Sequence, residues 1–257
     1  MEVLIVCIAA LAASSLTLFS GFGLGTLLMP VIAIFFQLEL AIAMTAMVHL
    51  ANNLFKIGLL GRKADYSVLI KFGLPAVAAA LIGAALLSWL GEIRPLYEYQ
   101  AFGRELQVSA LKLIIGFLII LFVAQELSPG FSNIALDRKW LSVGGAISGF
   151  FGGLSGHQGA FRSMFLIKVG LEKEVFVATG VVVAVMVDLS RLVIYGADIS
   201  LHSGAVNWPM VIASSAAAFA GAYLGARILR KVTIRTVQIV VSALLVVVGV
   251  GLIAGLL

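Results

Sequence analysis

The stretch Asn53-Leu-Phe-Lys56-Ile-Gly-Leu-Leu-Gly61 has a second version further along the chain, Asp188-Leu-Ser-Arg191-Leu-Val-Ile-Tyr-Gly196. In each version a polar residue, and a cation three positions later, interrupt an otherwise apolar helix. A glycine-rich break lies upstream of each version, at residues 20–25 (SGFGLG) and at residues 152–159 (GGLSGHQG). Two halves with the same interruptions at matching places are the pattern of a transporter whose binding site lies between its repeats.

The composition decides the class of protein. Of the 257 residues, 62% are hydrophobic and 11% charged, and the mean hydropathy is +1.15. Soluble domains carry about 25% charged residues, so the chain is predicted to be an all-α polytopic protein of the cell (inner) membrane. A β-barrel is excluded because its strands alternate in polarity, whereas these runs are continuously apolar. The net charge of +5 comes mostly from cations in short loops, which indicates membrane topology rather than nucleic-acid binding.

The apolar runs cover residues 3–19, 24–36, 40–60, 67–90, 108–127, 141–151, 159–170, 175–196, 205–226 and 235–256. Some of these are too short to span. The run 24–36 would reach about 20 Å as a helix, against a hydrocarbon core of about 30 Å. We therefore expect residues 3–36 and 141–170 to form V-shaped pairs whose arms meet at the glycine breaks inside the membrane. The segment 91–107 is expected to be a polar loop.

The chain is predicted to be one integral membrane domain of two repeats, 1–130 and 138–257. Each repeat would contain a V-shaped pair followed by three transmembrane helices. Loop cations favour the cytoplasmic side, which places these residues inside: Arg62, Lys63, Arg138, Lys139, Arg227, Arg230, Lys231 and Arg235. The segments 37–39, 91–107 and 197–204 and both termini then lie outside. Each half makes an odd number of crossings, so the two repeats are predicted to have inverted topology.

The glycine breaks are candidate anion sites. Where a half-helix begins, unpaired backbone N–H groups and the positive end of the helix dipole attract an anion. The alternative is close helix packing through small residues, but the seven glycines between residues 144 and 159 favour a cavity. The predicted substrate-binding residues are Gly23, Gly25, Thr26, Gly156, His157, Gln158, Gly159 and Arg162.

A polar stripe marks the helix predicted at 40–60, because Thr45, His49, Asn52, Asn53 and Lys56 recur at spacings of three and four. The equivalent helix carries a thinner stripe. Ionisable residues inside a membrane usually mark a pathway, so the pathway or gate candidates are His49, Asn52, Asn53, Lys56, Asp188 and Arg191. Two alternatives stay open: Lys56 and Arg191 could snorkel towards opposite faces of the membrane, and Asp188 and Arg191 could neutralise each other. With or without that pairing the remaining charge is positive, which favours an anionic substrate.

The sequence carries no pattern typical of an enzyme or a metal site. Two intramembrane histidines, His49 and His157, without cysteines or carboxylates in their sequence neighbourhood make a poor metal site, so neither metal nor cofactor is expected. A role for them in proton coupling is left open. HExxH, GxSxG and Walker A motifs are absent from the sequence. The chain is therefore predicted not to be an enzyme.

Two stretches carry a resemblance to a known family. One is the first break with its apolar arm, Ser20-Gly-Phe-Gly-Leu-Gly-Thr-Leu-Leu-Met-Pro30, and the other is Ser148-Gly-Phe-Phe-Gly-Gly-Leu-Ser-Gly-His-Gln-Gly-Ala-Phe-Arg-Ser163. With the helix end at 221–227, they resemble the TauE/SafE sulfite-exporter family of membrane permeases. The resemblance covers essentially the whole chain and implies secondary transport of small sulfur-containing anions such as sulfite, sulfoacetate and other organosulfonates.

The sequence thus predicts a secondary transporter that moves a small anion by alternating access. Export is favoured, and proton coupling is left open. The alternatives are a passive anion channel and, more weakly, an intramembrane enzyme. The expected partners are the anionic substrate and the lipid bilayer, without nucleic acid, and homo-oligomer formation is left open.

Overall fold

The structure, a computed structural model, describes residues 1–16, 23–60, 63–101, 103–128, 130, 136–201, 206–228 and 234–257. The helices of the first half are α1 (Glu2–Leu16), α2 (Leu24–Ile32), α3 (Leu38–Leu60), α4 (Tyr66–Val68), α5 (Leu74–Glu92) and α6 (Ala110–Leu127). Those of the second half are α8 (Leu141–Ser155), α9 (Gly159–Leu166), α10 (Lys173–Leu201), α11 (Trp208–Ile228) and α12 (Ile234–Ile253). Short helical turns, η3 (Arg138–Trp140) and η4 (Ile167–Val169), precede α8 and follow α9.

The chain is an all-α polytopic membrane protein, as predicted. Within the described ranges, four helices are long and apolar enough to cross a membrane, and they cover Leu38–Gly58, Tyr66–Glu92, Ala110–Leu127 and Lys173–Ala197. Parts of α1, α11 and α12 form shorter apolar helices. The indole rings of Trp89, Trp140 and Trp208 are exposed near helix ends, which is where membrane proteins place tryptophan at the lipid–water interface.

The second long span is a single element with a change of hydrogen-bonding pattern near its start. It begins at α4, which the Asp65 side chain caps by accepting from the backbone N–H of Val68. The next segment, η2 (Leu69–Gly73), is π-helical and leads directly into α5. Pro75 follows at the start of α5 and has no N–H to donate to the preceding turn. We attribute the local widening to this missing donor.

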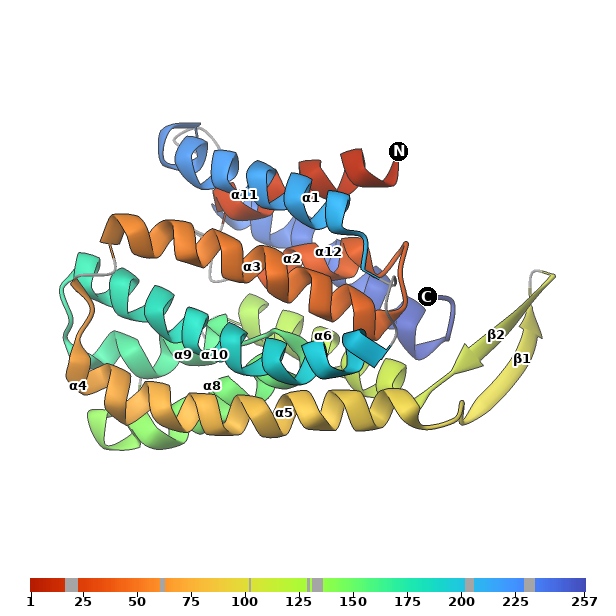
Figure 1. Cartoon of the computed structure of the whole chain (residues 1–257), viewed down its shortest axis with the longest axis horizontal. Helices are drawn as coiled ribbons and strands as arrows, with labels where there is room; N and C mark the ends of the chain where they lie inside the picture. The colour runs from red at the N-terminus through yellow and green to blue at the C-terminus, as the bar shows by residue number, and fades with distance from the viewer. Residues whose placement is uncertain are drawn as a thin grey trace.

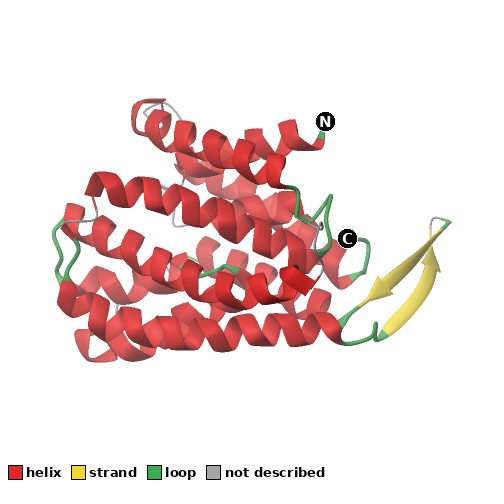
Figure 2. Ribbon diagram, in the orientation of Figure 1, coloured by secondary structure: helices red, strands yellow, loops and turns green. Residues whose placement is uncertain are grey.

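The prediction of a polar loop at 91–107 is wrong. β1 (Tyr97–Ala101) and β2 (Arg104–Val108) form an antiparallel hairpin that projects from one end of the helical bundle (Figures 1 and 2). Gly103 adopts a φ of 72° at its turn, which favours glycine. The Tyr99 hydroxyl donates to the backbone carbonyl of Ala254, so the hairpin is tied to the chain just after α12.

The helices pack in pairs that join the two halves. α1 packs on α11, α8 on α5, α3 on α10 and α6 on α12. The predicted repeat makes α1 equivalent to α8, α3 to α10, α5 to α11 and α6 to α12. If each helix is replaced by its equivalent, the same set of pairs results. α3 and α10 are antiparallel, because His49 faces Asp188 near their middles while Lys63 pairs with Glu174 close to the end of one helix and the start of the other. An inverted repeat requires this relation, although the repeats and their boundaries stay a prediction.

Segments predicted to share a side of the membrane meet at the same end of the bundle. At one end Lys63 pairs with Glu174, and the Arg138 guanidinium donates to the Ser67 hydroxyl at 3.5 Å. At the other end lie the hairpin, the start of α3 and both chain termini (Figure 1). The side chains of the predicted cation cluster, Arg227, Arg230, Lys231 and Arg235, fall outside the described residues. Which end faces the cytoplasm remains a prediction.

Three of the seven glycines between residues 144 and 159 form a close helix contact rather than a cavity, which corrects the expectation from their number. A Cβ at Gly145, Gly149 or Gly153 would collide with the backbone of Phe72, Ala76 or Ala80 respectively, so one face of α8 lies directly on η2 and α5. The small residues are there to let two backbones approach. The break itself is also shorter than predicted. α8 continues to Ser155, and only residues 156–158 interrupt the two helices.

We predict that Gly149→Ala destabilises the protein. The added methyl group meets the backbone of Ala76, which cannot move without separating α8 from α5. Overpacking of this kind costs about 1–3 kcal/mol, seen as a lower melting temperature of the detergent-solubilised protein. Gly58→Ala is the matched control, because nothing lies within 4 Å of a Cβ at Gly58. Equal melting temperatures for Gly149→Ala and the unsubstituted protein would contradict the close contact.

Candidate functional site

The two breaks meet inside the bundle. α2 begins at Leu24 after Gly23, and α9 begins at Gly159 after Gln158, close to the predicted starts. A Cβ at Gly25 would lie 3.5 Å from the carbonyl oxygen of Gly156. Gly156 ends α8 with a φ of 81°, a left-handed conformation that favours glycine. Residues 20–22 of the first break lie outside the described residues.

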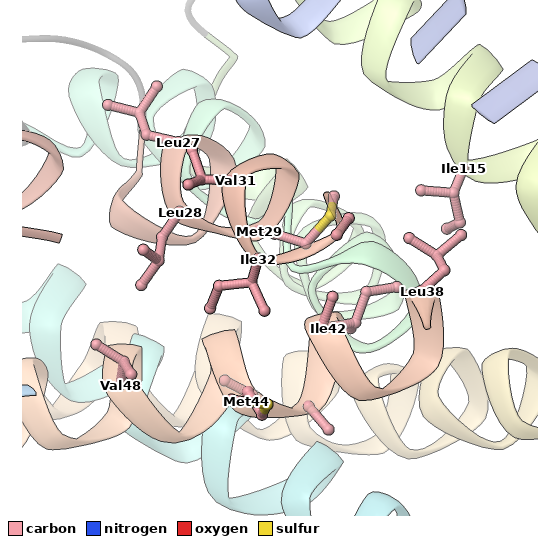
Figure 3. Packing of buried hydrophobic residues seen from close by; sticks show 14 of the residues in the cluster. Leu27, Leu28, Met29, Val31, Ile32, Leu38, Ile42, Met44, Val48 and Ile115 are labelled. Carbon is pink, nitrogen blue, oxygen red and sulfur yellow. The ribbon is translucent and has the colours of Figure 1, made fainter. Parts of the chain in front are cut away.

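α2 holds the first break away from lipid. All nine of its residues are buried, and its apolar side chains join a cluster with α3 and α6. Figure 3 shows Ile32 of α2 with Ile42 of α3 and Ile115 of α6 in this cluster. At 1.5 Å per residue, α2 is only about 14 Å long and cannot span the membrane. The non-helical backbone at the start of α2 is therefore surrounded by protein, as non-helical backbone at membrane depth must be.

A buried ionic network lies beside the breaks and centres on Asp188. One carboxylate oxygen of Asp188 lies 2.6 Å from Nδ1 of His49. The other accepts from Arg191 through Nη2 at 2.7 Å and Nε at 3.1 Å, and from Gln158 Nε2 at 3.4 Å. Asp188 and Arg191 are 0% and 1% exposed. Of the two alternatives that the sequence left open for Arg191, pairing with Asp188 is confirmed and snorkelling is wrong.

Arg191 and Tyr195 connect this network to the end of α8. Nη1 of Arg191 donates to the carbonyl oxygen of Gly152 at 3.2 Å, and the Tyr195 hydroxyl donates to the carbonyl oxygen of Gly153. Gly153 is in helical conformation next to a break, where carbonyl groups lose their helical partners. Arg191 thus bonds to the end of α8 and neutralises Asp188, while Tyr195 bonds only to the end of α8.

Two further cations lie towards the Lys63–Glu174 end of the bundle. Arg162 donates from Nη1 to Gln158 Oε1 at 3.4 Å, and its Nε lies near Gly180 of α10. Lys56 is half-buried and interacts electrostatically with Arg162. On α3 it lies between His49 and the Lys63 end. Lys56 and Arg191 therefore lie on opposite sides of the His49–Asp188 pair, although only Lys56 is near an end of the bundle.

Three buried polar atoms near the breaks have no hydrogen-bond partner among the described residues: Thr45 Oγ1, Asn52 Nδ2 and His157 Nε2. The Thr45 methyl carbon would lie 3.8 Å from a Cβ at Gly25, so this threonine borders the junction of the breaks. Asn52 accepts from the Ser14 hydroxyl of α1 at 3.3 Å through its Oδ1. Unpaired buried polar atoms are rare because each costs free energy, so the region around the junction is a candidate ligand site.

The remaining candidates occupy supporting positions. Thr26 and Asn53 are buried, and Nδ2 of Asn53 lies 3.1 Å from Nδ1 of His49 and 3.3 Å from its Nε2. Ser148 donates to the carbonyl oxygen of Gln158 at 2.9 Å and fixes the second break to α8. The sequence-based site omitted two contributors, Thr45 and Phe122. Thr45 lies one turn before His49 on the polar stripe, which was the available signal. The ring of Phe122 stacks on His157 at 4.8 Å, and nothing in the sequence pairs these positions.

A sequence profile of the family described as sulfite exporter TauE/SafE matches residues 6–252. The chain belongs to this family. No curated protein and no solved structure matches it. TauE/SafE proteins are membrane transporters, so membership makes the chain a multi-pass membrane permease and implies the export of an anion rather than an enzymatic role. The matched region includes every candidate residue described above.

We predict that Asp188→Asn strongly destabilises this TauE/SafE protein. The substitution leaves the Arg191 guanidinium buried without a counter-charge, and breaking a buried pair from one side costs about 3–5 kcal/mol. The double variant Asp188→Asn/Arg191→Gln should recover much of that loss, because neither charge remains. Thermal unfolding of both single variants and the double variant in detergent gives the coupling. Additive losses would show that the pair does not act as a unit.

Proposed function

We propose that this protein is a secondary transporter for a small sulfur oxyanion, which binds where the two helix breaks meet. The observation that carries the proposal is a pair of buried donors on α3 that have no partner among the described residues: the Thr45 hydroxyl, on a residue that borders the junction of Gly25 and Gly156, and the Asn52 amide two turns further along. The Thr45 hydroxyl and the Asn52 amide can both donate to an anion. The amino ends of α2 and α9 add backbone N–H groups and a positive dipole end. Half-helix ends that face a central site are a recurrent device of transporters with paired repeats.

The charge balance around the breaks supports an anion. Lys56, Arg162 and Arg191 carry three positive charges, whereas Asp188 carries a single negative charge. Asp188 is already engaged by Arg191 and His49. The excess positive charge lies in a medium of low dielectric constant, where it attracts an anion more strongly than in water. A pyramidal or tetrahedral oxyanion offers several acceptor oxygens, which fits donors that come from different helices.

Sulfite and organosulfonates are the proposed substrates, and export is the proposed direction, in line with the family. The anion would be contacted by the eight predicted binding residues: Gly23, Gly25, Thr26, Gly156, His157, Gln158, Gly159 and Arg162. His49, Asn52, Asn53, Lys56, Asp188 and Arg191 would line or gate the pathway. Thr45 is added to the binding set on the strength of its unpaired hydroxyl.

Alternating access is the proposed mechanism. A cavity of about 540 Å³ opens at the hairpin end, and residues 33–39, Gln107 and Lys112 contribute to its lining. At the opposite end the Lys63–Glu174 pair joins the first half to the second. Alternating access would require the Lys63–Glu174 contact to separate as α3 and α10 tilt against each other.

The proposal is tested by transport in proteoliposomes. We expect labelled sulfite to leave vesicles that contain the protein faster than protein-free vesicles, with competition by methanesulfonate and sulfoacetate but not by acetate. A passive channel with the same site would give flux but no uphill movement by exchange against an excess of unlabelled anion. Sulfite flux at the protein-free rate would refute the proposal.

Thr45→Val should weaken anion binding and leave the fold intact. Valine has nearly the same shape as threonine but no hydroxyl, and a hydrogen bond to a charged group contributes about 1.5–3 kcal/mol, so the apparent KM for sulfite should rise by about 10- to 100-fold. Ser215→Ala is the matched control, because the Ser215 hydroxyl is also buried but donates to its own helix at Val211. An unchanged KM in Thr45→Val would remove Thr45 from the site.

A further inference from the structure

The imidazole of His157 is fixed in one tautomer by its neighbours. It lies in the second break and is 4% exposed. Its Nδ1 is 3.0 Å from the carbonyl oxygen of Ser155, which can only accept. The Ser155 hydroxyl is also near Nδ1, but it donates to the carbonyl oxygen of Phe151 at 3.1 Å. We therefore assign the hydrogen to Nδ1, from the hydrogen-bond partners.

This assignment leaves a lone pair on Nε2. The atom is buried and has no partner among the described residues. A lone pair repels an anion, so neutral His157 opposes an anion at the junction of the breaks. A proton on Nε2 reverses the effect, because the imidazolium donates from both ring nitrogens and carries a positive charge.

The surroundings favour the imidazolium only when an anion is present. Asp188, the nearest acid described on α10, is saturated by Arg191 and His49 and leaves no free counter-charge for His157. Burial disfavours an uncompensated charge. The ring of Phe122 stacks on the imidazole and stabilises a cation through its π face. The other ionisable groups on the neighbouring helices are Arg162 on α9, Glu39, His49 and Lys56 on α3, Lys173, Glu174, Arg191, Tyr195 and Asp198 on α10, and Lys112 and Glu126 on α6, whereas α2 and α8 carry none.

We propose that His157 takes up a proton on Nε2 together with the anion, so that the permease carries the two as a pair. The inference rests on the proposed function, because it uses the same anion site. Linkage is reciprocal: if the proton strengthens anion binding, the anion strengthens proton binding by the same factor. For a monovalent anion the transported pair is electrically neutral. The direction of net transport then follows the product of the anion and proton gradients rather than the membrane potential.

The binding step is tested with the purified full-length protein in weakly buffered detergent solution. Methanesulfonate is the probe, because it remains a monoanion at every pH used and releases or takes up no proton itself. We expect uptake of about one proton per bound anion at pH values above the ordinary range of histidine. His157→Gln should bind the anion more weakly and take up no proton, whereas the control variant Ser215→Ala should retain both binding and uptake. Anion binding without proton uptake, or proton uptake that persists in His157→Gln, would overturn the inference.

The transport step is tested with methanesulfonate and with hydrogen sulfite, buffered below its second pKa. In proteoliposomes the flux should respond to an imposed pH gradient and ignore a potassium-diffusion potential. His157→Gln should show slower flux that responds to the potential instead. Wild-type flux that follows the potential and ignores the pH gradient would refute pairing with a proton. The absence of flux of both anions in the wild type would instead be a failure of the proposed function.

Discussion

The structure depends on one constraint: a helix that breaks inside a membrane must have its free backbone groups satisfied by protein or by a ligand. In the second half residues 156–158 form such a break, and in the first half α2 begins after the extended Gly23. Each second arm is too short to return across the bilayer, and α2 is buried along its whole length. The breaks therefore meet in the interior, with Gly25 against Gly156. This places two helix amino ends, and the polar atoms that border them, where both halves could contact one anion.

The ionic network around Asp188 stabilises this arrangement and connects the halves. A buried ion pair contributes little net stability compared with apolar packing, because desolvation offsets the Coulomb attraction. The role of this ion pair is better explained by its position. The Asp188 carboxylate contacts His49 of the first half and accepts a hydrogen bond from Gln158 of the second break. Arg191 donates to a carbonyl oxygen in the last turn of α8. Movement of either half would therefore shift the residues of the break, as the proposed alternating access requires.

The sequence predicted the class of protein and the short arms, because these follow from composition and run length, and the spacing along one helix raised the pairing of Asp188 with Arg191 as an alternative. It could not predict contacts between distant segments. His49 opposite Asp188 and Phe122 on His157 depend on how the halves pack. The glycines misled for the same reason: Gly149 and Gly153 fit against α5, and a glycine that admits a helix looks the same in sequence as a glycine that opens a cavity.

The most direct test of the central claim locates the anion. Crystals of the protein soaked in selenite, the selenium analogue of sulfite, would show the bound anion by its anomalous scattering. We predict a peak between the two breaks, with selenite oxygens about 3 Å from Thr45 Oγ1 and His157 Nε2. A peak only in the cavity at the hairpin end beside Lys112, or no peak in crystals of protein that transports sulfite, would contradict an anion site where the helix breaks meet.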